Sequence, residues 1–147
     1  MITDTSKGRH SLIIDEVTMA PQTRMTKQRK VILEELRKVT SHPTADEVYD
    51  MVRQRLPRIS LGTIYRNLDV LAESGEILKL ESAGNQKRFD GNPMPHAHIR
   101  CTRCGRVGDV MNVGIEVPLD GMDVYGFTVT SARIEFDGIC DACQSTN

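Results

Sequence analysis

The chain has 147 residues and a formal net charge of −1, which excludes the overall positive field that marks many nucleic-acid-binding proteins. The charge is uneven, because residues 1–91 carry 15 Lys and Arg against 13 Asp and Glu, whereas residues 92–147 carry 4 against 7. No apolar run reaches the ~18 residues that span a bilayer, and the N-terminus lacks the pattern of a signal peptide. We therefore expect a cytoplasmic protein with no membrane partner, in which any bound polyanion meets the first half of the chain.

The first 20 residues are polar with little periodicity, and we expect residues 1–20 to be a loose arm. After the arm, apolar residues recur with a helical period and predict a first helix over about residues 27–39. His42-Pro43 interrupts this pattern. Thr44-Ala-Asp-Glu47 then has the form of a capping box, which predicts the start of a second helix.

A third helix and a hairpin follow. Ser60 is a candidate N-cap, and Gly75 is placed to end the helix. Beyond Gly75, residues Ile77–Glu81 and Gln86–Asp90 predict two short strands joined at Gly84-Asn85. Three short helices and a hairpin are the outline of a winged helix-turn-helix, so residues 21–91 are interpreted as a DNA-binding domain. The alternative is a small helical bundle with a solvated, charged face.

In a winged helix-turn-helix the third helix enters the major groove of DNA. Arg66 can bridge O6 and N7 of a guanine, and the ring of Tyr65 can pack on a thymine methyl group. We expect four residues to lie on the face of this helix away from its apolar side: Thr63, Tyr65, Arg66 and Asn67. Basic residues around the helix are candidate phosphate contacts: Arg24, Arg29, Lys79 and Lys87.

Four cysteines form two pairs in the second half, Cys101-x-x-Cys104 and Cys140-x-x-Cys143. A two-residue gap lets both sulfurs of a pair point at one ion, and two such pairs supply the four thiolates of a closed, tetrahedral zinc site. The long intervening segment means that the second pair must return from another element, so the zinc ion would fasten the end of the chain to the start of this domain. Redox-active pairs and free thiols are the alternatives.

Residues 92–147 are interpreted as a small α/β dimerisation domain, which gives the whole chain an α+β fold. Strands are expected at Val107–Val110, Phe127–Val129 and Ile134–Phe136. The stretch Val113–Gly126 has some helical character, which Pro118 and Gly121 shorten or kink. Few strands and little core suggest that a second copy completes this domain, and a homodimer suits a protein that reads a two-fold operator.

A second group of metal-binding residue types surrounds the first cysteine pair: Asp90, His96, His98 and Asp109. On a strand, two histidines separated by one residue face the same side. Imidazoles combined with carboxylates suit a divalent iron, manganese or zinc ion. The alternative is that the histidines are simply solvated.

Several strings of residues together resemble the ferric uptake regulator family over residues 22–143. They are His42-Pro-Thr-Ala-Asp46, Thr63-Ile-Tyr65-Arg66-Asn-Leu68, Arg88-Phe-Asp90, His96-Ala-His98 with Cys101-x-x-Cys104-Gly, and Cys140-x-x-Cys143. The resemblance implies a dimeric, metal-dependent repressor of double-stranded operator DNA, with structural Zn²⁺ and regulatory Fe²⁺ or Mn²⁺. It also implies that His42 joins Asp90, His96, His98 and Asp109 in a regulatory site that straddles the hinge between the two domains.

The resemblance points to two branches of this family. Aspartate at position 109 resembles the peroxide-sensing branch, in which site-bound ferrous iron reacts with hydrogen peroxide and a ligand histidine, here His42 or His96, is oxidised. Arg66 instead resembles the iron-uptake branch, while the zinc-uptake branch ranks third. A further metal site of some members is expected to be absent, because Ala97 and Ala132 replace its ligands and leave Glu116 without partners.

Peroxide-responsive repression is therefore the main hypothesis, and an iron-responsive repressor without peroxide sensing is the alternative. Two hypotheses lie outside the family. One is a zinc hydrolase that uses His96, His98 and Asp90, but the sequence offers no further acid–base candidate for it. The other is a purely structural zinc module, which leaves the combination of His42, Asp90 and Asp109 unexplained. We expect a regulator and not an enzyme.

Overall fold

The computed structural model describes residues 23–81, 86–116, 121–130 and 132–146. The expected arm over residues 1–20, the turn at Gly84-Asn85 and the kink at Pro118 lie outside these residues. The first half contains helices α1 (Lys27–Arg37), α2 (Ala45–Val52) and α3 (Leu61–Glu73), then strands β1 (Leu78–Leu80) and β2 (Arg88–Asp90). The second half contains β3 (Ala97–Cys101), β4 (Val107–Val110), β5 (Glu135–Gly138) and the short helix α4 (Asp141–Gln144).

Each of the first three helices begins at a hydroxyl side chain that caps its free backbone N–H groups. Thr26 accepts a hydrogen bond from the Arg29 amide in α1, and Ser60 accepts one from the Thr63 amide in α3. At α2 the expected capping box forms, because Thr44 and Glu47 bond each other's backbone N–H groups. These helices are confirmed, and none of the described helices is long and apolar enough to cross a membrane.

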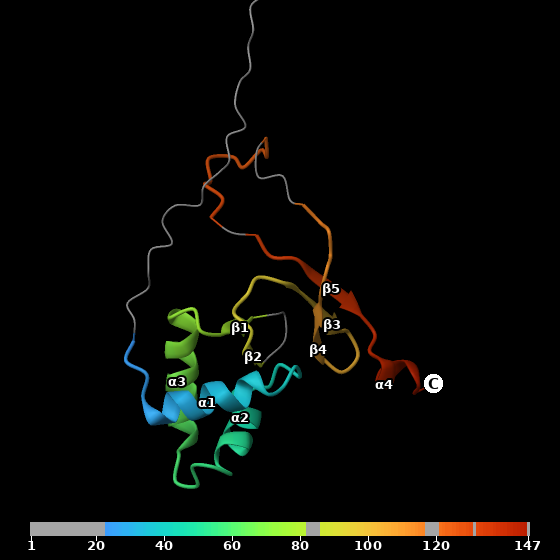
Figure 1. The fold of residues 1–147 in the computed structure, drawn as a ribbon. Coiled ribbons are helices and arrows are strands. Elements are labelled where there is room, and N and C mark those ends of the chain that lie inside the picture. The colour runs from blue at the N-terminus through green and yellow to red at the C-terminus, as the bar shows by residue number, and fades with distance from the viewer. Residues whose placement is uncertain (1–22, 82–85, 117–120, 131, 147) are drawn as a thin grey trace, which may run out of the picture.

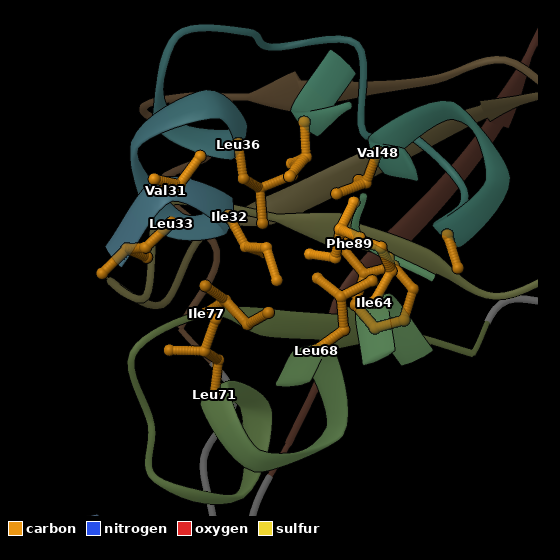
Figure 2. Close-up of a cluster of buried hydrophobic side chains, with 13 residues drawn as sticks. Val31, Ile32, Leu33, Leu36, Val48, Ile64, Leu68, Leu71, Ile77 and Phe89 are labelled. Carbon is orange, nitrogen blue, oxygen red and sulfur yellow. The ribbon is translucent and has the colours of Figure 1, made fainter. Parts of the chain in front are cut away.

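One hydrophobic core joins the three helices to the hairpin (Figure 2). Ile32 and Leu36 of α1 point toward Ile64 and Leu68 of α3, and all four side chains are completely buried. Phe89 of β2 lies in the same cluster and is its one aromatic member among the described residues. Because Phe89 is in this core, the residues on either side of it in β2 are held firmly against the helices.

The strands form two separate sheets. β1 and β2 pair antiparallel as the expected hairpin, and β3 lies at the centre of a three-stranded sheet in the order β4-β3-β5. β4 runs antiparallel to β3 and places Asp109 opposite His98, whereas β5 runs parallel to β3 and places Gly138 opposite Cys101. Figure 1 shows the hairpin between the helices and this second sheet.

The connection between β4 and β5 differs from the expectation. Phe127–Val129 is not a strand, and neither residues 113–116 nor residues 121–126 form a helix. Glycines with positive φ interrupt both patterns, at Gly114 (60°), Gly121 (82°) and Gly126 (88°). The alternating apolar residues also have no neighbouring strand among the described residues, and the Phe127 side chain is 79% exposed. The third strand does form, but over Glu135–Gly138 and not Ile134–Phe136.

Candidate metal centres and nucleic-acid interface

The four cysteines come together at one end of the three-stranded sheet, and their sulfur atoms all lie within 4.8 Å of one another. Cys101 is the last residue of β3, and Cys104 follows in a turn closed by Gly105 with a φ of 75°. Parallel pairing of β5 with β3 delivers the chain to Cys140, which begins α4. The predicted return of the second pair from another element is therefore what the structure shows.

The sulfur positions suit a tetrahedral ion. Cys104 Sγ and Cys140 Sγ are 3.7 Å apart, close to the ~3.8 Å expected for two sulfurs bonded to one zinc at about 2.3 Å. Hydrogen bonds from the backbone amides of Cys140 and Cys104 lower the pKa of Cys101 to about 6. Hydrogen bonding to Cys104 and Cys140 raises the pKa of Cys143 to about 12. Four adjacent thiolates repel one another, so a divalent cation is what this group needs to ionise fully.

A second group of possible ligands lies where the helical half meets the sheet. His42 comes from the loop before α2, and Asp90 is the last residue of β2. His96 precedes β3, His98 lies in β3, and Asp109 lies opposite it in β4. Their ligand atoms also fall within 4.8 Å of one another, so the structure brings together all five residues that the resemblance assigned to the regulatory site.

The three histidines of this group point their Nε2 atoms at two carboxylate oxygens. Asp109 Oδ1 is 2.7 Å from His42 Nε2 and 2.9 Å from His96 Nε2. Asp90 Oδ2 is 3.0 Å from His96 Nε2 and 3.3 Å from His98 Nε2. The histidine side chains are at most 11% exposed and Asp90 is 7% exposed, whereas Asp109, at 24%, is the most open to solvent.

The other polar atoms of these residues are held by the protein. His96 Nδ1 donates to the carbonyl oxygen of Met94 at 2.7 Å, and the Asn92 amide donates to Asp90 Oδ1 at 2.8 Å. A neutral His96 with its proton on Nδ1 presents a lone pair on Nε2 to two carboxylates that can only accept. Such an arrangement needs a cation between these atoms, and outer bonds of this kind are what orient metal ligands.

His42 gives the same indication. It is 1% exposed, and neither ring nitrogen has a hydrogen-bond partner among the described residues, because its close approach to Asp109 lacks hydrogen-bond geometry. Its φ of 50° is unusual for a residue with a Cβ atom. A buried, unpaired polar atom on a strained backbone is costly, and such residues gather at functional sites. The donor set fits a divalent ion such as Fe²⁺ or Mn²⁺.

The electrostatics of the five groups are mutually dependent. Burial raises the pKa of Asp90, but the close approach of His42 and the hydrogen bonds with the Asn92 amide and His98 outweigh burial and lower that pKa to about 2. Burial lowers the pKa of His42, yet contacts with Asp90 and Asp109 leave it raised. The pKa of His98 is lowered, first by burial and then by the neighbouring histidines. Metal binding would displace protons from the imidazoles, since a coordinated ring nitrogen must be unprotonated.

The predicted DNA-contacting residues are distributed over α3 and its surroundings. Tyr65 and Arg66 are exposed on α3, and the Tyr65 hydroxyl donates to Asp46 at 3.1 Å. The Thr63 hydroxyl is 2.8 Å from that of Ser60 at the start of the helix. Asn67, expected on this exposed face, instead lies on the buried side, because residues 64, 67, 68 and 71 share one face of a helix.

Asn67 joins two other predicted residues. Its side chain donates to the Thr63 carbonyl at 2.8 Å and accepts from Arg29 Nε at 3.0 Å. Arg29 in turn donates to the Arg24 carbonyl at 2.7 Å, so Asn67 orients a basic segment beside α3. The two basic residues near the hairpin are paired with acids, Lys79 with Asp69 at 2.7 Å and Lys87 with Glu81 at 3.5 Å. A phosphate would have to compete with these carboxylates.

The chain also resembles known proteins. Residues 20–137 match the Ferric uptake regulator family. This chain belongs to that family. It is 38% identical over 122 residues to the peroxide-responsive repressor PerR of Staphylococcus epidermidis, covering 82% of this chain and 81% of that protein. The peroxide operon regulator of Bacillus subtilis is also 38% identical over 122 residues, covering 82% and 84%. The solved peroxide stress regulator of Campylobacter jejuni has a TM-score of 0.60 and 26% identity, covering 79% of this chain and 88% of that chain.

Membership of the ferric uptake regulator family confirms the fold and the general function predicted from sequence. The chain has the α+β architecture of the family's structures, with a winged helix-turn-helix and a small domain that contains a four-cysteine cluster. Its function is that of a metal-dependent transcriptional repressor.

Three residues without a predicted role in the site support the candidate ligands. Gly91 is packed so closely against the end of α1 that an added Cβ would lie 3.0 Å from the Leu36 carbonyl and the Arg37 nitrogen. Asn92 holds Asp90 through its amide, and Arg88 donates to the His42 carbonyl. Arg88 belongs to the string Arg88-Phe-Asp90 that carried the resemblance, so its position beside a ligand was the available signal.

The cysteine cluster leads to a first prediction. If the four thiolates hold zinc, Cys101→Ser should release most of the metal and unfold the sheet, because a structural zinc site contributes its binding energy to folding. Metal analysis after gel filtration and far-UV circular dichroism would measure both effects. Ser145→Ala is the control, since Ser145 follows α4 and, within the described part of the chain, its hydroxyl donates only to the Asp141 carbonyl. A Cys101→Ser protein that stays folded would contradict the assignment of a structural zinc site to the four cysteines.

The close packing at Gly91 leads to a second prediction. Gly91→Ala should destabilise the zinc-loaded protein by ~1–3 kcal/mol and weaken Mn²⁺ binding about tenfold, because the backbone after Asp90 must move away from α1. Urea unfolding and Mn²⁺ titration would measure these changes. Gly108→Ala is the matched control, since Gly108 precedes Asp109 and, of the described residues, its Cβ would meet only Ile99, at an ordinary 3.7 Å. Equal effects of the two substitutions would contradict the assignment.

Proposed function

We propose that this chain is a homodimeric repressor that binds operator DNA when His42, Asp90, His96, His98 and Asp109 hold Fe²⁺ or Mn²⁺. Hydrogen peroxide would end repression by oxidising one of the ligand histidines. The observation that carries this proposal is the convergence of these five side chains from both halves of the chain, with their ligand atoms within 4.8 Å. In this proposal the DNA-binding domain ends and the dimerisation domain begins at about Gly91-Asn92.

The residues act first by joining the two halves. His42 and Asp90 are attached to the helical core, whereas His98 and Asp109 belong to the three-stranded sheet. Without the cation, the two neighbouring carboxylates would repel each other, and the three imidazoles would compete for the protons that offset this repulsion. A metal ion that binds more tightly when the five side chains converge therefore favours that closed arrangement of the two halves. In a dimer, closure would also fix the orientation of α3 relative to the dimer axis.

Peroxide sensing is supported by the relatives and by the position of the ligands. The similar proteins of Staphylococcus epidermidis and Bacillus subtilis are named as peroxide-responsive regulators. His42, Asp90, His96, His98 and Asp109 would hold the iron(II) ion, which would supply the redox chemistry that activates hydrogen peroxide. In the net reaction the imidazole loses two electrons and gains one peroxide oxygen, and the other peroxide oxygen leaves as water. His42 and His96 both approach Asp109, the ligand most open to solvent, and are the expected targets.

An iron-responsive repressor without histidine oxidation is the second candidate. Tyr65-Arg66, the pair that resembles the iron-uptake branch, is exposed on α3 as a DNA-reading pair should be. The two candidates share the same metal site and the same DNA-binding helix. They differ only in what peroxide does to the iron-loaded protein.

The four cysteines are assigned to structural zinc in this proposal. Four cysteine sulfurs would fill all four coordination positions of a tetrahedral zinc ion, which leaves no open position for catalysis. The His/Asp group is also unlike a catalytic zinc site, which usually has three protein ligands and a bound water. Five converging protein ligands therefore favour a regulatory site over the hydrolase hypothesis.

DNA binding is assigned to α3 with its neighbouring basic residues. Arg66 and Tyr65 would read bases, Thr63 would lie near the backbone at the start of the helix, and Asn67 would act through Arg29. Lys79 and Lys87 would give up their ion pairs with Asp69 and Glu81 and contact phosphates instead. Arg24 and Arg29 would also contact phosphates.

The second half of the chain supports dimerisation. Between β4 and β5 it exposes large apolar side chains that a second copy would cover, because a monomer rarely leaves so many together in water. Tyr125 is 86% exposed and Phe127 is 79% exposed. The other exposed apolar residues of this segment are Met111, Ile115, Met122 and Val129.

A peroxide experiment tests the proposal and separates the two candidates. Operator binding by zinc-loaded protein would be measured anaerobically with Mn²⁺, with Fe²⁺, and with Fe²⁺ plus micromolar hydrogen peroxide. We expect peroxide to abolish DNA binding only by the iron-loaded protein. We also expect the mass of His42 or His96 to increase by ~16 Da, the mass of one oxygen atom.

Asp109→Glu is the matched variant for this experiment. It keeps the charge but moves the carboxylate, and we expect metal-dependent DNA binding with loss of the peroxide response. If DNA binding by the wild-type protein follows metal occupancy and peroxide modifies no histidine, the iron-responsive candidate is correct. DNA binding that is independent of added metal would sink both candidates.

The DNA-reading assignment gives a separate prediction. Arg66→Ala should weaken operator binding by ~1–3 kcal/mol and relax specificity at one base position. Fluorescence anisotropy with the operator and single-base variants would measure both effects. Arg106→Ala is the control for loss of positive charge, since Arg106 pairs with Asp141 in the second half. Unchanged operator affinity in Arg66→Ala would show that the recognition helix is misplaced.

A further inference from the structure

His42 stands in a segment that is attached to β2 by backbone contacts. Thr44 forms an isolated antiparallel bridge with Arg88, and the Phe89 amide donates to the Pro43 carbonyl at 3.0 Å. Phe89 is fixed in the hydrophobic core, so these contacts locate the segment along β2. They do not by themselves hold the His42 backbone, which precedes them and has a φ of 50°.

The Arg88 side chain makes the contact that reaches His42 itself. Its Nη1 atom donates to the His42 carbonyl oxygen at 3.0 Å. The same Nη1 lies 3.7 Å from Glu47 Oε2, and the Arg88 side chain is only 22% exposed. Removing the guanidinium would leave the His42 carbonyl without this donor on a backbone that is already strained.

Glu47 extends this contact to the start of α2. Glu47 Oε2 accepts a hydrogen bond from the Thr44 amide at 2.7 Å, as the side-chain half of the capping box. One carboxylate oxygen therefore faces both the Arg88 guanidinium and the helix cap. The neighbouring Asp46 accepts from the Tyr65 hydroxyl at 3.1 Å, so the first turn of α2 also contacts the exposed face of α3.

We propose that Arg88 is a positioning residue for the regulatory metal site. Its guanidinium holds His42 in the conformation that aims Nε2 at Asp90 and Asp109, and it ties that conformation to the first turn of α2. This inference rests on the proposed function, because it gives Arg88 a role in binding the same metal ion. It adds a contact through which occupancy of the site affects the turn that touches Tyr65.

Arginine suits this position better than lysine. The planar guanidinium has several N–H donors in a fixed fork, and it can face a carbonyl oxygen and a carboxylate together. A lysine ammonium is a compact, strongly hydrated charge on a flexible stem, so it would hold the two acceptors less firmly. Arg88→Lys therefore separates loss of positive charge from loss of the fixed geometry.

The test measures metal binding by zinc-loaded protein without DNA. Co²⁺ absorption spectra would report the ligand geometry, and Mn²⁺ titration would give the affinity. We expect Arg88→Gln to weaken Mn²⁺ binding by 10- to 100-fold, the usual range for loss of an outer contact to a ligand, and to alter the Co²⁺ spectrum. Arg88→Lys should show a smaller loss in the same direction. Zinc content should stay unchanged. In a separate assay with operator DNA, saturating Mn²⁺ should restore operator binding by the variants.

Arg53→Gln is the matched control, because Arg53 lies just after α2 and pairs with the exposed Asp50 at 3.5 Å. If Arg88→Gln fails to fold, Arg88→Lys decides: weakened binding with an altered Co²⁺ spectrum supports the inference. Wild-type affinity in a folded Arg88 variant overturns the inference alone. A wild-type protein that binds no second divalent ion overturns the proposed function and the inference with it.

Discussion

Two carboxylates that face three largely buried imidazoles are the constraint on which the rest of the structure depends. Asp90 and Asp109 each approach more than one Nε2 atom within 3.3 Å. A carboxylate can only accept hydrogen bonds, and His96 already donates its Nδ1 proton to the Met94 carbonyl. The negative charge of the two carboxylates is therefore balanced only when a cation lies among these atoms. Protons can serve at low pH, whereas a divalent metal serves at neutral pH with the imidazoles unprotonated.

This constraint explains why rigid packing surrounds the site. Asp90 follows Phe89, which is buried in the helical core, and Gly91 permits the chain to pass directly over the end of α1. On the other side, antiparallel pairing fixes His98 opposite Asp109. Each half thus presents ligands on a stiff element, so an ion that binds all of them fixes the relation between the halves. A flexible site would absorb the same binding energy locally and transmit little of it.

The sequence predicted features that depend on local chemistry. The caps at Thr44 and Ser60, the helical periods and the cysteine pairs each need only a few neighbouring residues to be recognised. His96 and His98 could be paired by the two-residue strand period, but His42 entered through the family resemblance, since nothing near it in the chain marks it as a ligand. Phe127–Val129 shows the opposite failure: the alternation was present, yet a strand also requires a partner, and the described chain offers none.

The two candidate metal centres would make different physical contributions, because their ligands come from different parts of the fold. The cysteines all lie in the second half, at the end of β3, in the turn that follows it, and at the start of and within α4, so an ion bound there would stabilise that half alone. The candidate His/Asp ligands come from both halves, so an ion bound there would stabilise the arrangement of one half relative to the other. A switch also requires that the ion can leave, and in the proposed site the partly exposed Asp109 and the unpaired ring nitrogens of His42 would favour exchange. Permanent fastening is therefore assigned to the thiolates and reversible closure to the imidazoles and carboxylates.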